Sequence, residues 1–238
     1  GPVRAGVPIA DLTSGLFAAI GILIALLDRE RTGEGRWVKV SLLTSQVAML
    51  DFQAAAWLME GKVYRQSGND HPYTTPMGVY PASDGDILIG ASGQGQYRKL
   101  CEAIGAPHLL TDPRFATADA RLANRPAFNE ALSAVTRTRT VAEWVPLLNE
   151  AGIACGPINT IDQVFADPQV QHSGIVQRVV HPRLGEIALL GSPITLSGGE
   201  AQIKTAAPEK GEHTDAVLQE AGYTEAEIVA LRTAGVIP

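Results

Sequence analysis

One carboxylate stands alone among apolar residues near the start of the sequence. Asp11 lies in GVPIADLTSG, and the next charged side chain along the chain is Asp28. An Asp at the start of a helix can accept hydrogen bonds from the backbone N–H groups of the first turn, and the helix dipole favours its ionised form. A carboxylate held in this way can act as a nucleophile. The same pattern fits an ordinary N-cap, so the residues alone leave both roles open.

Other reactive side chains form no recognised catalytic or metal-binding motif. The string GASGQGQ lacks the spacing of a phosphate-binding loop or a dinucleotide fingerprint. There is no GxSxG elbow, and Cys101 and Cys155 lie far apart without a CxxC pairing. The histidines, which lack the short spacings of a metal site, are His71, His108, His172, His181 and His213. We therefore predict no metal, and neither Ser nor Cys hydrolysis is supported.

The stretch after Asp11 is apolar on every side. Its run from Leu16 to Leu27 has 12 residues, fewer than the ~20 that span a bilayer, and it ends in charged residues. We expect a helix over residues 12–31 that other elements enclose, with Gly33 ending it. A short strand over residues 37–41 and a second helix capped by Ser41 and ending at Gly61 should follow.

The remaining sequence predicts interspersed helices and strands. Residues 62–76 are polar and rich in turn formers, and a hairpin with its turn at Asp84 and Gly85 should follow. Residues 175–191 resemble two further strands. The helix starts that the sequence indicates are capping boxes at Thr140, Thr160 and Thr224 and a cap at Thr214. This mixture indicates an α/β or α+β class.

Composition restricts the classes of partner. The chain has 238 residues, a formal net charge of −6, 45% hydrophobic residues and 18% charged residues, values typical of soluble globular proteins. An acidic chain without Lys/Arg clusters argues against nucleic acid or an anionic membrane as its main partner. With only two cysteines and no signal peptide visible in GPVRAGVP, we predict a cytoplasmic location.

Five ordered blocks of the sequence resemble family III CoA-transferases, the group that contains formyl-CoA and carnitine CoA-transferases. The first block is residues 6–43, and the others contain HPYTTPMGVYPASDG, DPRFATADARLANR, AGIACGPINTIDQVFADPQV and GEHTDAVLQEAGYTEAEIVALRTAGVI. The resemblance covers essentially the whole chain. It implies an α/β fold with a Rossmann-like large domain, incomplete in this chain, a small α/β domain, and two chains interlocked as a dimer.

The resemblance also assigns a role to Asp11. In this family the Asp of the first block is the nucleophile, and it aligns with Asp11. The implied reaction begins with attack on an acyl-CoA thioester to give a mixed anhydride, and it continues through an aspartyl-CoA thioester to a carboxylic acid acceptor. Coenzyme A enters as part of the acyl-CoA substrate. Residues expected to contact substrate or CoA are His71, Tyr73, Met77, Gly93 and Gln94.

The same comparison predicts the organisation of the chain. Residues 1–67 should belong to the large domain, residues 68–168 should form the small domain, and residues 169–238 should return to the large domain. Family chains carry an α/β portion before the catalytic block that this chain lacks. We therefore expect a homodimer or a complex with a chain that supplies this half, a truncated chain, or a processed product.

Two departures and two rival functions remain open. Some family members have a long glycine-run loop before the small-domain hairpin, and here HPYTTPMG or GASGQGQ would have to shield the site instead. The first rival is an α-methylacyl-CoA racemase, which pairs an Asp with a His. The second is a non-catalytic CoA-binding or assembly subunit.

Overall fold

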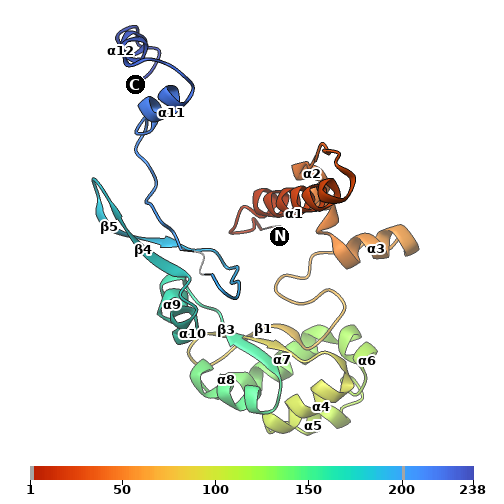
Figure 1. Cartoon of the computed structure of the whole chain (residues 1–238). Helices are drawn as coiled ribbons and strands as arrows, with labels where there is room; N and C mark the ends of the chain where they lie inside the picture. The colour runs from red at the N-terminus through yellow and green to blue at the C-terminus, as the bar shows by residue number, and fades with distance from the viewer. Residues whose placement is uncertain (1–2, 200–201) are drawn as a thin grey trace. The chain divides into compact units, whose positions relative to one another are not determined.

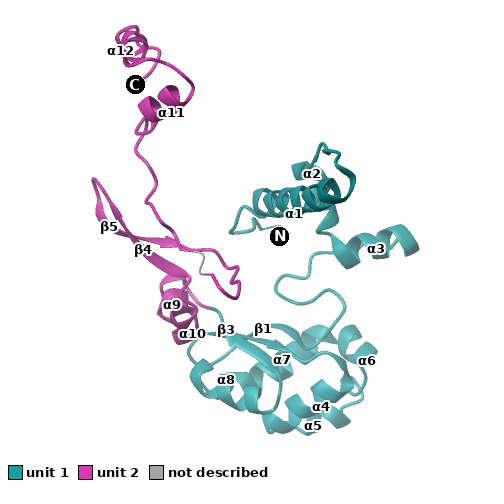
Figure 2. Ribbon diagram, in the orientation of Figure 1, with its two compact units in different colours: residues 1–158 teal, residues 159–238 magenta. Residues whose placement is uncertain are grey.

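A computed structural model describes residues 3–199 and 202–238. The chain divides into two compact units, residues 1–158 and residues 159–238, which Figure 2 distinguishes by colour. Helices and short antiparallel strands alternate along the chain, and Figure 1 labels them in order. The domain boundaries expected after residues 67 and 168 stay a prediction.

The first unit begins with three helices. Helix α1 spans Ile9–Thr32 and ends at Gly33, whose left-handed backbone (φ 74°) lets its N–H donate to the Arg29 carbonyl. Ser41 caps helix α2, Leu42–Ala48, by accepting a hydrogen bond from the Thr44 N–H. Helix α3, Asp51–Glu60, ends at Gly61 as predicted.

Two local predictions in this region are wrong. The second helix is broken into α2 and α3, because residues 49–50 form a turn and Asp51 adopts a positive φ of 46° that a continuous helix does not allow. Residues 37–41 form no strand and pair with no described strand. Alternating residues favoured a strand there, and a strand needs a partner for its backbone groups.

Helix α1 is apolar but not enclosed within this chain, which corrects the prediction of a buried helix. Thr13 is its one buried residue, while Leu23 is 60% exposed and Leu27 is 73% exposed. The helix also extends beyond the run from which we inferred that it is too short to span a bilayer. With 24 residues and a mean hydropathy of 2.1 over its most apolar window, α1 is long and apolar enough to cross a membrane by length and composition alone.

Residues 77–157 form a small antiparallel sheet packed with helices (Figure 1). Strands β1, Met77–Pro81, and β2, Asp86–Gly90, make the predicted hairpin, with Val79 opposite Leu88. Strand β3, Ala154–Pro157, adds to β2 with Cys155 opposite Ile89. The helices between β2 and β3 are α4 (Gly93–Ala103), α5 (His108–Thr111), α6 (Ala118–Ala123), α7 (Arg125–Thr136) and α8 (Val141–Glu150).

The hydrophobic core of the first unit lies between this sheet and its helices. Ile87 and Ile89 of β2 are fully buried, because alternate residues of a strand point to one face. Trp144 of α8 is buried and donates from its indole nitrogen to the Thr136 carbonyl over 2.7 Å. The helical residues that complete the core include Tyr97, Leu100, Phe128, Leu132 and Leu148.

The second unit contains short helices and one hairpin. Strands β4, Val176–His181, and β5, Gly185–Leu190, pair antiparallel as predicted for residues 175–191. The helices are α9 (Ile161–Ala166), α10 (Pro168–His172), α11 (Thr214–Glu220) and α12 (Glu225–Thr233). Among the described residues of this unit, His181 and Ile228 alone are buried.

The capping predictions succeed wherever a complete box is present. The boxes at Thr140, Thr160 and Thr224 start α8, α9 and α12. The prediction that Thr214 caps a helix is wrong, since His213 occupies the N-cap and makes no side-chain cap hydrogen bond. A lone Thr lacks the reciprocal Glu or Gln that fixes the register of a box.

Candidate active site

Asp11 lies in the first turn of α1, where it is the third helical residue. The N-cap is Pro8, which makes no side-chain cap, so the alternative role of Asp11 as an ordinary N-cap does not apply. The helix begins earlier because proline fixes a φ near the helical value and is tolerated at helix starts. The Pro8 carbonyl already accepts from the Leu12 N–H over 3.0 Å. At its actual position the Asp11 carboxylate still lies near the positive end of the helix dipole.

The turn that carries Asp11 is tied down, whereas its carboxylate is exposed. Thr13 donates to the Ile9 carbonyl over 2.7 Å and accepts from the Gln46 amide of α2 over 3.3 Å. In the described part of the chain no hydrogen bond or ion pair reaches the Asp11 carboxylate. Asp28, near the other end of this helix, is held by arginines that lower its pKa through hydrogen bonds. Asp11 and Asp28 thus have opposite environments.

His71 and Tyr73 lie together in the loop before β1. Their rings meet edge to face with centroids 4.5 Å apart. Phe52 of α3 contacts both rings, at 5.6 Å from His71 and 5.1 Å from Tyr73. Tyr64 packs near Tyr73 at 5.8 Å. The loop therefore joins helix α3 to the small sheet through an aromatic cluster.

The other predicted contact residues follow directly in the fold. Met77 is the first residue of β1, and its carbonyl accepts from the His71 N–H over 2.8 Å. Gly93 starts α4 with a φ of 81°. Gln94 uses both ends of its amide internally, since it donates to the Ala116 carbonyl over 2.8 Å and accepts from Arg121 over 3.2 Å.

The structure brings His71, Tyr73 and Met77 together at one loop and links Gln94 to that loop only through Arg121, but it does not connect any of them to Asp11. In residues 3–199 and 202–238, no hydrogen bond, ion pair or ring contact joins Asp11 to any of the other predicted site residues. Across those same residues, no group of three or more His, Cys, Asp or Glu side chains could hold a metal ion.

Sequence reasoning missed Arg121, the only fully buried arginine among the described residues. Its guanidinium donates to the Thr75 carbonyl over 3.1 Å and to the Phe115 carbonyl over 2.9 Å, and it stacks on the Tyr97 ring at 3.8 Å. Burial lowers the pKa of Arg121, although an arginine stays charged in proteins. The burial of Arg121 could have been anticipated, because it is a charged residue in a predicted helix with apolar residues on either side.

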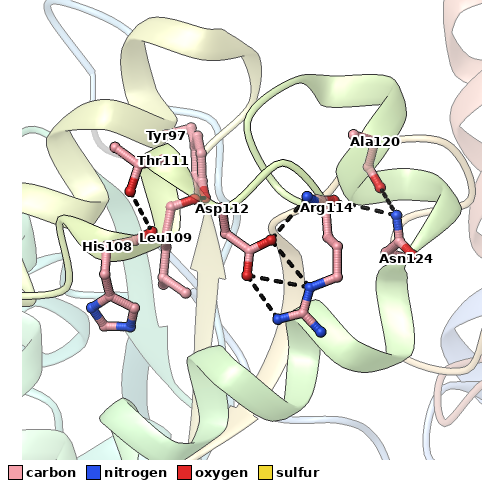
Figure 3. Close-up of polar contacts among 8 residues, drawn as sticks. All are labelled: Tyr97, His108, Leu109, Thr111, Asp112, Arg114, Ala120 and Asn124. Carbon is pink, nitrogen blue, oxygen red and sulfur yellow. Dashed lines mark hydrogen bonds and ion pairs between the residues drawn. The ribbon is translucent and has the colours of Figure 1, made fainter.

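The DPRF segment that precedes Arg121 is itself a fixed turn (Figure 3). Asp112 and Arg114 pair through two parallel bonds, of 3.1 Å from Nε and 2.7 Å from Nη2, and the pairing lowers the pKa of Asp112. Tyr97 donates to the Leu109 carbonyl over 2.8 Å, and Asn124 donates to the Ala120 carbonyl over 2.9 Å. The Asp112–Arg114 pair fixes the turn directly before Phe115, whose carbonyl accepts from Arg121.

Similarity to known proteins defines the class of this chain. The sequence matches CoA-transferase family III over residues 1–214. The chain therefore belongs to CoA-transferase family III.

Curated relatives share sequence along almost the whole chain. A succinyl-CoA:glutarate CoA-transferase of Mus musculus is 36% identical over 237 residues, which cover 99% of this chain and 54% of that protein. An acetyl-CoA:oxalate CoA-transferase of Acetobacter aceti is 32% identical and is covered to 57% of its length. The chain thus spans about half the length of the curated relatives it matches.

Solved structures show the same fold. A CAIB/BAIF family protein from Brucella suis aligns with a TM-score of 0.74 at 34% identity, over 92% of this chain and 57% of that one. A hypothetical protein from Mycobacterium tuberculosis aligns with a TM-score of 0.76 at 27% identity, over 91% of this chain and 56% of its own. The fold of the described chain is that of family III.

Proposed function

We propose that this chain carries the nucleophile of a CoA-transferase that moves CoA from an acyl-CoA thioester to a carboxylic acid. The observation that supports this most directly is Asp11 itself. It is an exposed carboxylate in the first turn of a long helix, and no described side chain forms a hydrogen bond or ion pair with it. The carboxylate lies near the positive end of the helix dipole, and the bonds of Thr13 fix the turn.

In the first half of the proposed reaction, an Asp11 oxygen attacks the carbonyl of the acyl-CoA thioester. The carbon–sulfur bond breaks, and CoA leaves as a thiolate while a mixed anhydride forms on Asp11. The thiolate then attacks the aspartyl carbonyl of the anhydride. The donor acid departs as a carboxylate and leaves an aspartyl-CoA thioester.

In the second half, the acceptor carboxylate attacks the aspartyl thioester and displaces CoA thiolate. The thiolate then attacks the acceptor carbonyl of the new anhydride, which releases acceptor-CoA and restores Asp11. Both anhydrides are labile in water, so the reaction requires a dry site. Relatives named for glutarate and oxalate suggest that the acceptor is a dicarboxylic acid.

Water exclusion leads to a proposal about partners. Asp11 and most of the apolar side chains of α1 are exposed in this chain, and an exposed anhydride would hydrolyse. We expect α1 to be covered in the working enzyme by further polypeptide, either a second copy of this chain or the region that its longer relatives carry in addition. Mass spectrometry of the native assembly distinguishes these two arrangements.

The experiment that tests the function traps the covalent intermediate. The native enzyme assembly is incubated with succinyl-CoA and quenched with hydroxylamine, which attacks the aspartyl-CoA thioester, releases CoA and leaves a hydroxamate on the aspartate. Peptide mass spectrometry should find this hydroxamate at Asp11. Asp11→Asn should abolish both the adduct and transfer to glutarate.

Asp51 offers a matched control. It is also an exposed aspartate in the first turn of a helix, and asparagine tolerates its positive φ. Asp51→Asn should retain the Asp11 adduct and the transfer activity. Transfer that persists in Asp11→Asn would show that another group is the nucleophile.

A second assay separates transfer from racemisation. A 2-methylacyl-CoA incubated with the enzyme in deuterium oxide gains deuterium at its α-carbon only if that proton is exchanged. Transfer without deuterium uptake supports the proposal. Rapid α-deuteration without transfer would instead support a racemase.

A further inference from the structure

The loop of residues 69–76, which contains His71 and Tyr73, is held by three side chains. Arg125 donates from one terminal nitrogen to the His71 carbonyl over 2.7 Å and to the Pro72 carbonyl over 3.2 Å. Arg121 donates to the Thr75 carbonyl over 3.1 Å. Asn129 donates to the Asp70 carboxylate over 3.0 Å. The three contacts are distributed along the length of the loop.

These three residues are spaced four apart in the sequence. Arg121 belongs to α6, and Arg125 and Asn129 belong to α7, which follows after a single residue. Arg125 and Asn129, which are four apart within α7, lie on the same side of that helix, and Arg121 reaches the loop from the preceding helix. We call Arg121, Arg125 and Asn129 the donor ladder.

The loop also lies tightly against strand β1. A side chain at Gly78 would place its Cβ 2.5 Å from an Asp70 oxygen, so only glycine fits without a shift. Asn129 accepts from the Tyr80 hydroxyl over 3.3 Å while it donates to Asp70. Burial and the nearby Asp70 charge raise the pKa of Tyr80, which keeps this hydroxyl protonated as a donor. The sheet and the donor ladder thus fix the same loop.

Arg121 is a costly way to stabilise a fold. Its side chain is fully buried, and its described acceptors are the neutral oxygens of Thr75, Phe115 and Gln94. Well-packed apolar residues often serve as well as, or better than, buried charges for stability alone. The guanidinium orients three segments at once, those that contain Thr75, Phe115 and Gln94. An apolar side chain cannot do this.

The rings of His71 and Tyr73 take no part in the ladder bonds. Tyr73 remains 42% exposed, and both rings contact Phe52. The ladder therefore fixes the backbone of the loop and leaves these two side chains available to line a site.

We propose that Arg121, Arg125 and Asn129 are positioning residues that hold the 69–76 loop as a wall of the CoA-transfer site. In this arrangement His71 and Tyr73 shield the acyl group on Asp11 from water. The proposal rests on the proposed function, because it assigns the loop to the site of Asp11. The ladder residues themselves touch no reacting atom.

The first test needs no activity. Hydrogen–deuterium exchange of the native assembly should show faster exchange of the His71 amide, which bonds to the Met77 carbonyl, in Arg125→Ala than in the unchanged protein. The loss of a hydrogen bond from a charged donor predicts that the exchange rate of this amide increases about tenfold or more. Arg125→Lys should restore part of the protection, because an ammonium can bind one carbonyl. Arg137→Ala, an exposed change on the same segment, should leave the loop unaffected.

The second test measures the fate of the acyl group. In Arg125→Ala, the ratio of succinyl-CoA hydrolysis to transfer should rise about tenfold, and Arg125→Lys should reverse part of this change. A purely structural role would lower the amount of active enzyme without changing the ratio. Asn129→Ala, which loses only the Asp70 contact, should shift both measurements in the same direction by less and serves if Arg125→Ala does not fold.

The outcomes separate this proposal from the proposed function. An Asp11 hydroxamate formed normally, with unchanged loop exchange or an unchanged ratio in folded ladder variants, would overturn the positioning role alone. If no Asp11 hydroxamate forms while the ladder variants accelerate loop exchange, the loop is held as described but its assignment to an acyl-aspartate site is wrong.

Discussion

Helices α1 to α3 and the small sheet with its helices use similar apolar residues in different surroundings. Ile87 and Leu100 around the sheet are fully buried, whereas Leu23 and Leu58 in the N-terminal helices are 60% and 80% exposed. Burial of apolar surface contributes roughly 25 cal/mol per Å². The sheet region gains this contribution within the chain, and most of α1 does not. An apolar sequence therefore shows that a helix needs a partner without showing that the same chain supplies it.

The largest expected effect is in the core of the sheet region. Trp144→Ala should lower the free energy of unfolding by about 3–5 kcal/mol, because it opens a cavity and removes the indole bond to Thr136. Urea unfolding followed by circular dichroism measures this loss. A cost below about 1 kcal/mol would mean that this region does not form an independent core.

A smaller effect is expected at Arg121. Arg121→Met keeps an apolar stem of similar length but leaves the buried carbonyls of Thr75 and Phe115 without their donor, which should cost about 1–3 kcal/mol. The same urea experiment measures it. Arg137→Met on the exposed surface is the control and should change stability by less than about 0.5 kcal/mol.

The capping box of α8 should contribute less again. Thr140→Ala removes the bonds of its hydroxyl to the N–H and the carboxylate of Glu143 and should cost about 1 kcal/mol in urea unfolding. An unchanged midpoint would indicate that packing alone sets the start of this helix.

The same box should carry a pH dependence. Bonds from the Thr140 backbone and hydroxyl hold the pKa of Glu143 below its ordinary value. A lowered folded-state pKa means that the contribution is present above the unfolded pKa, about 4.3, and is lost as the pH falls through the folded value. Unfolding midpoints of the unchanged protein and Glu143→Gln should therefore differ at neutral pH and converge in acid. A difference that persists in acid would contradict this assignment.

The smallest effect is expected on α1, whose apolar residues are exposed in contrast to the buried ones around the sheet. Leu23→Ala should change the stability of this chain alone by less than about 0.5 kcal/mol, because Leu23 is largely exposed. If further polypeptide covers α1, the same change should cost the native assembly about 2–5 kcal/mol. Thermal unfolding of both samples compares the two values. Equal, small losses would indicate that this face of α1 stays uncovered.

Much of the local structure could be predicted because short-range chemistry decides it. The complete capping boxes at Thr140, Thr160 and Thr224 start helices, and Gly33 and Gly61 end them. The hairpin of β1 and β2 follows from strand formers on either side of a tight turn. The errors include one that depends on a distant partner, the unpaired residues 37–41, and two in local backbone, the break before Asp51 and the absent cap at Thr214.

For the candidate site, sequence selected single residues and structure supplied their relations. Asp11 was selected by its isolation and by its family block, yet its position in the first turn, after Pro8, needed the backbone. Gln94 was selected from a glycine-rich string, and only the structure shows that its amide is engaged by Arg121 and Ala116. The sequence pattern identified none of the donor ladder, because its acceptors lie about 50 residues away.

By itself the sequence determined membership of family III, the candidate carboxylate Asp11 and one end each of several helices, since these depend on residue identity and near neighbours. Tertiary structure alone decided which apolar segments are buried and which side chains hold the 69–76 loop. Burial and hydrogen bonding between distant segments depend on how the chain folds back on itself. No local pattern of residues encodes these contacts between distant segments.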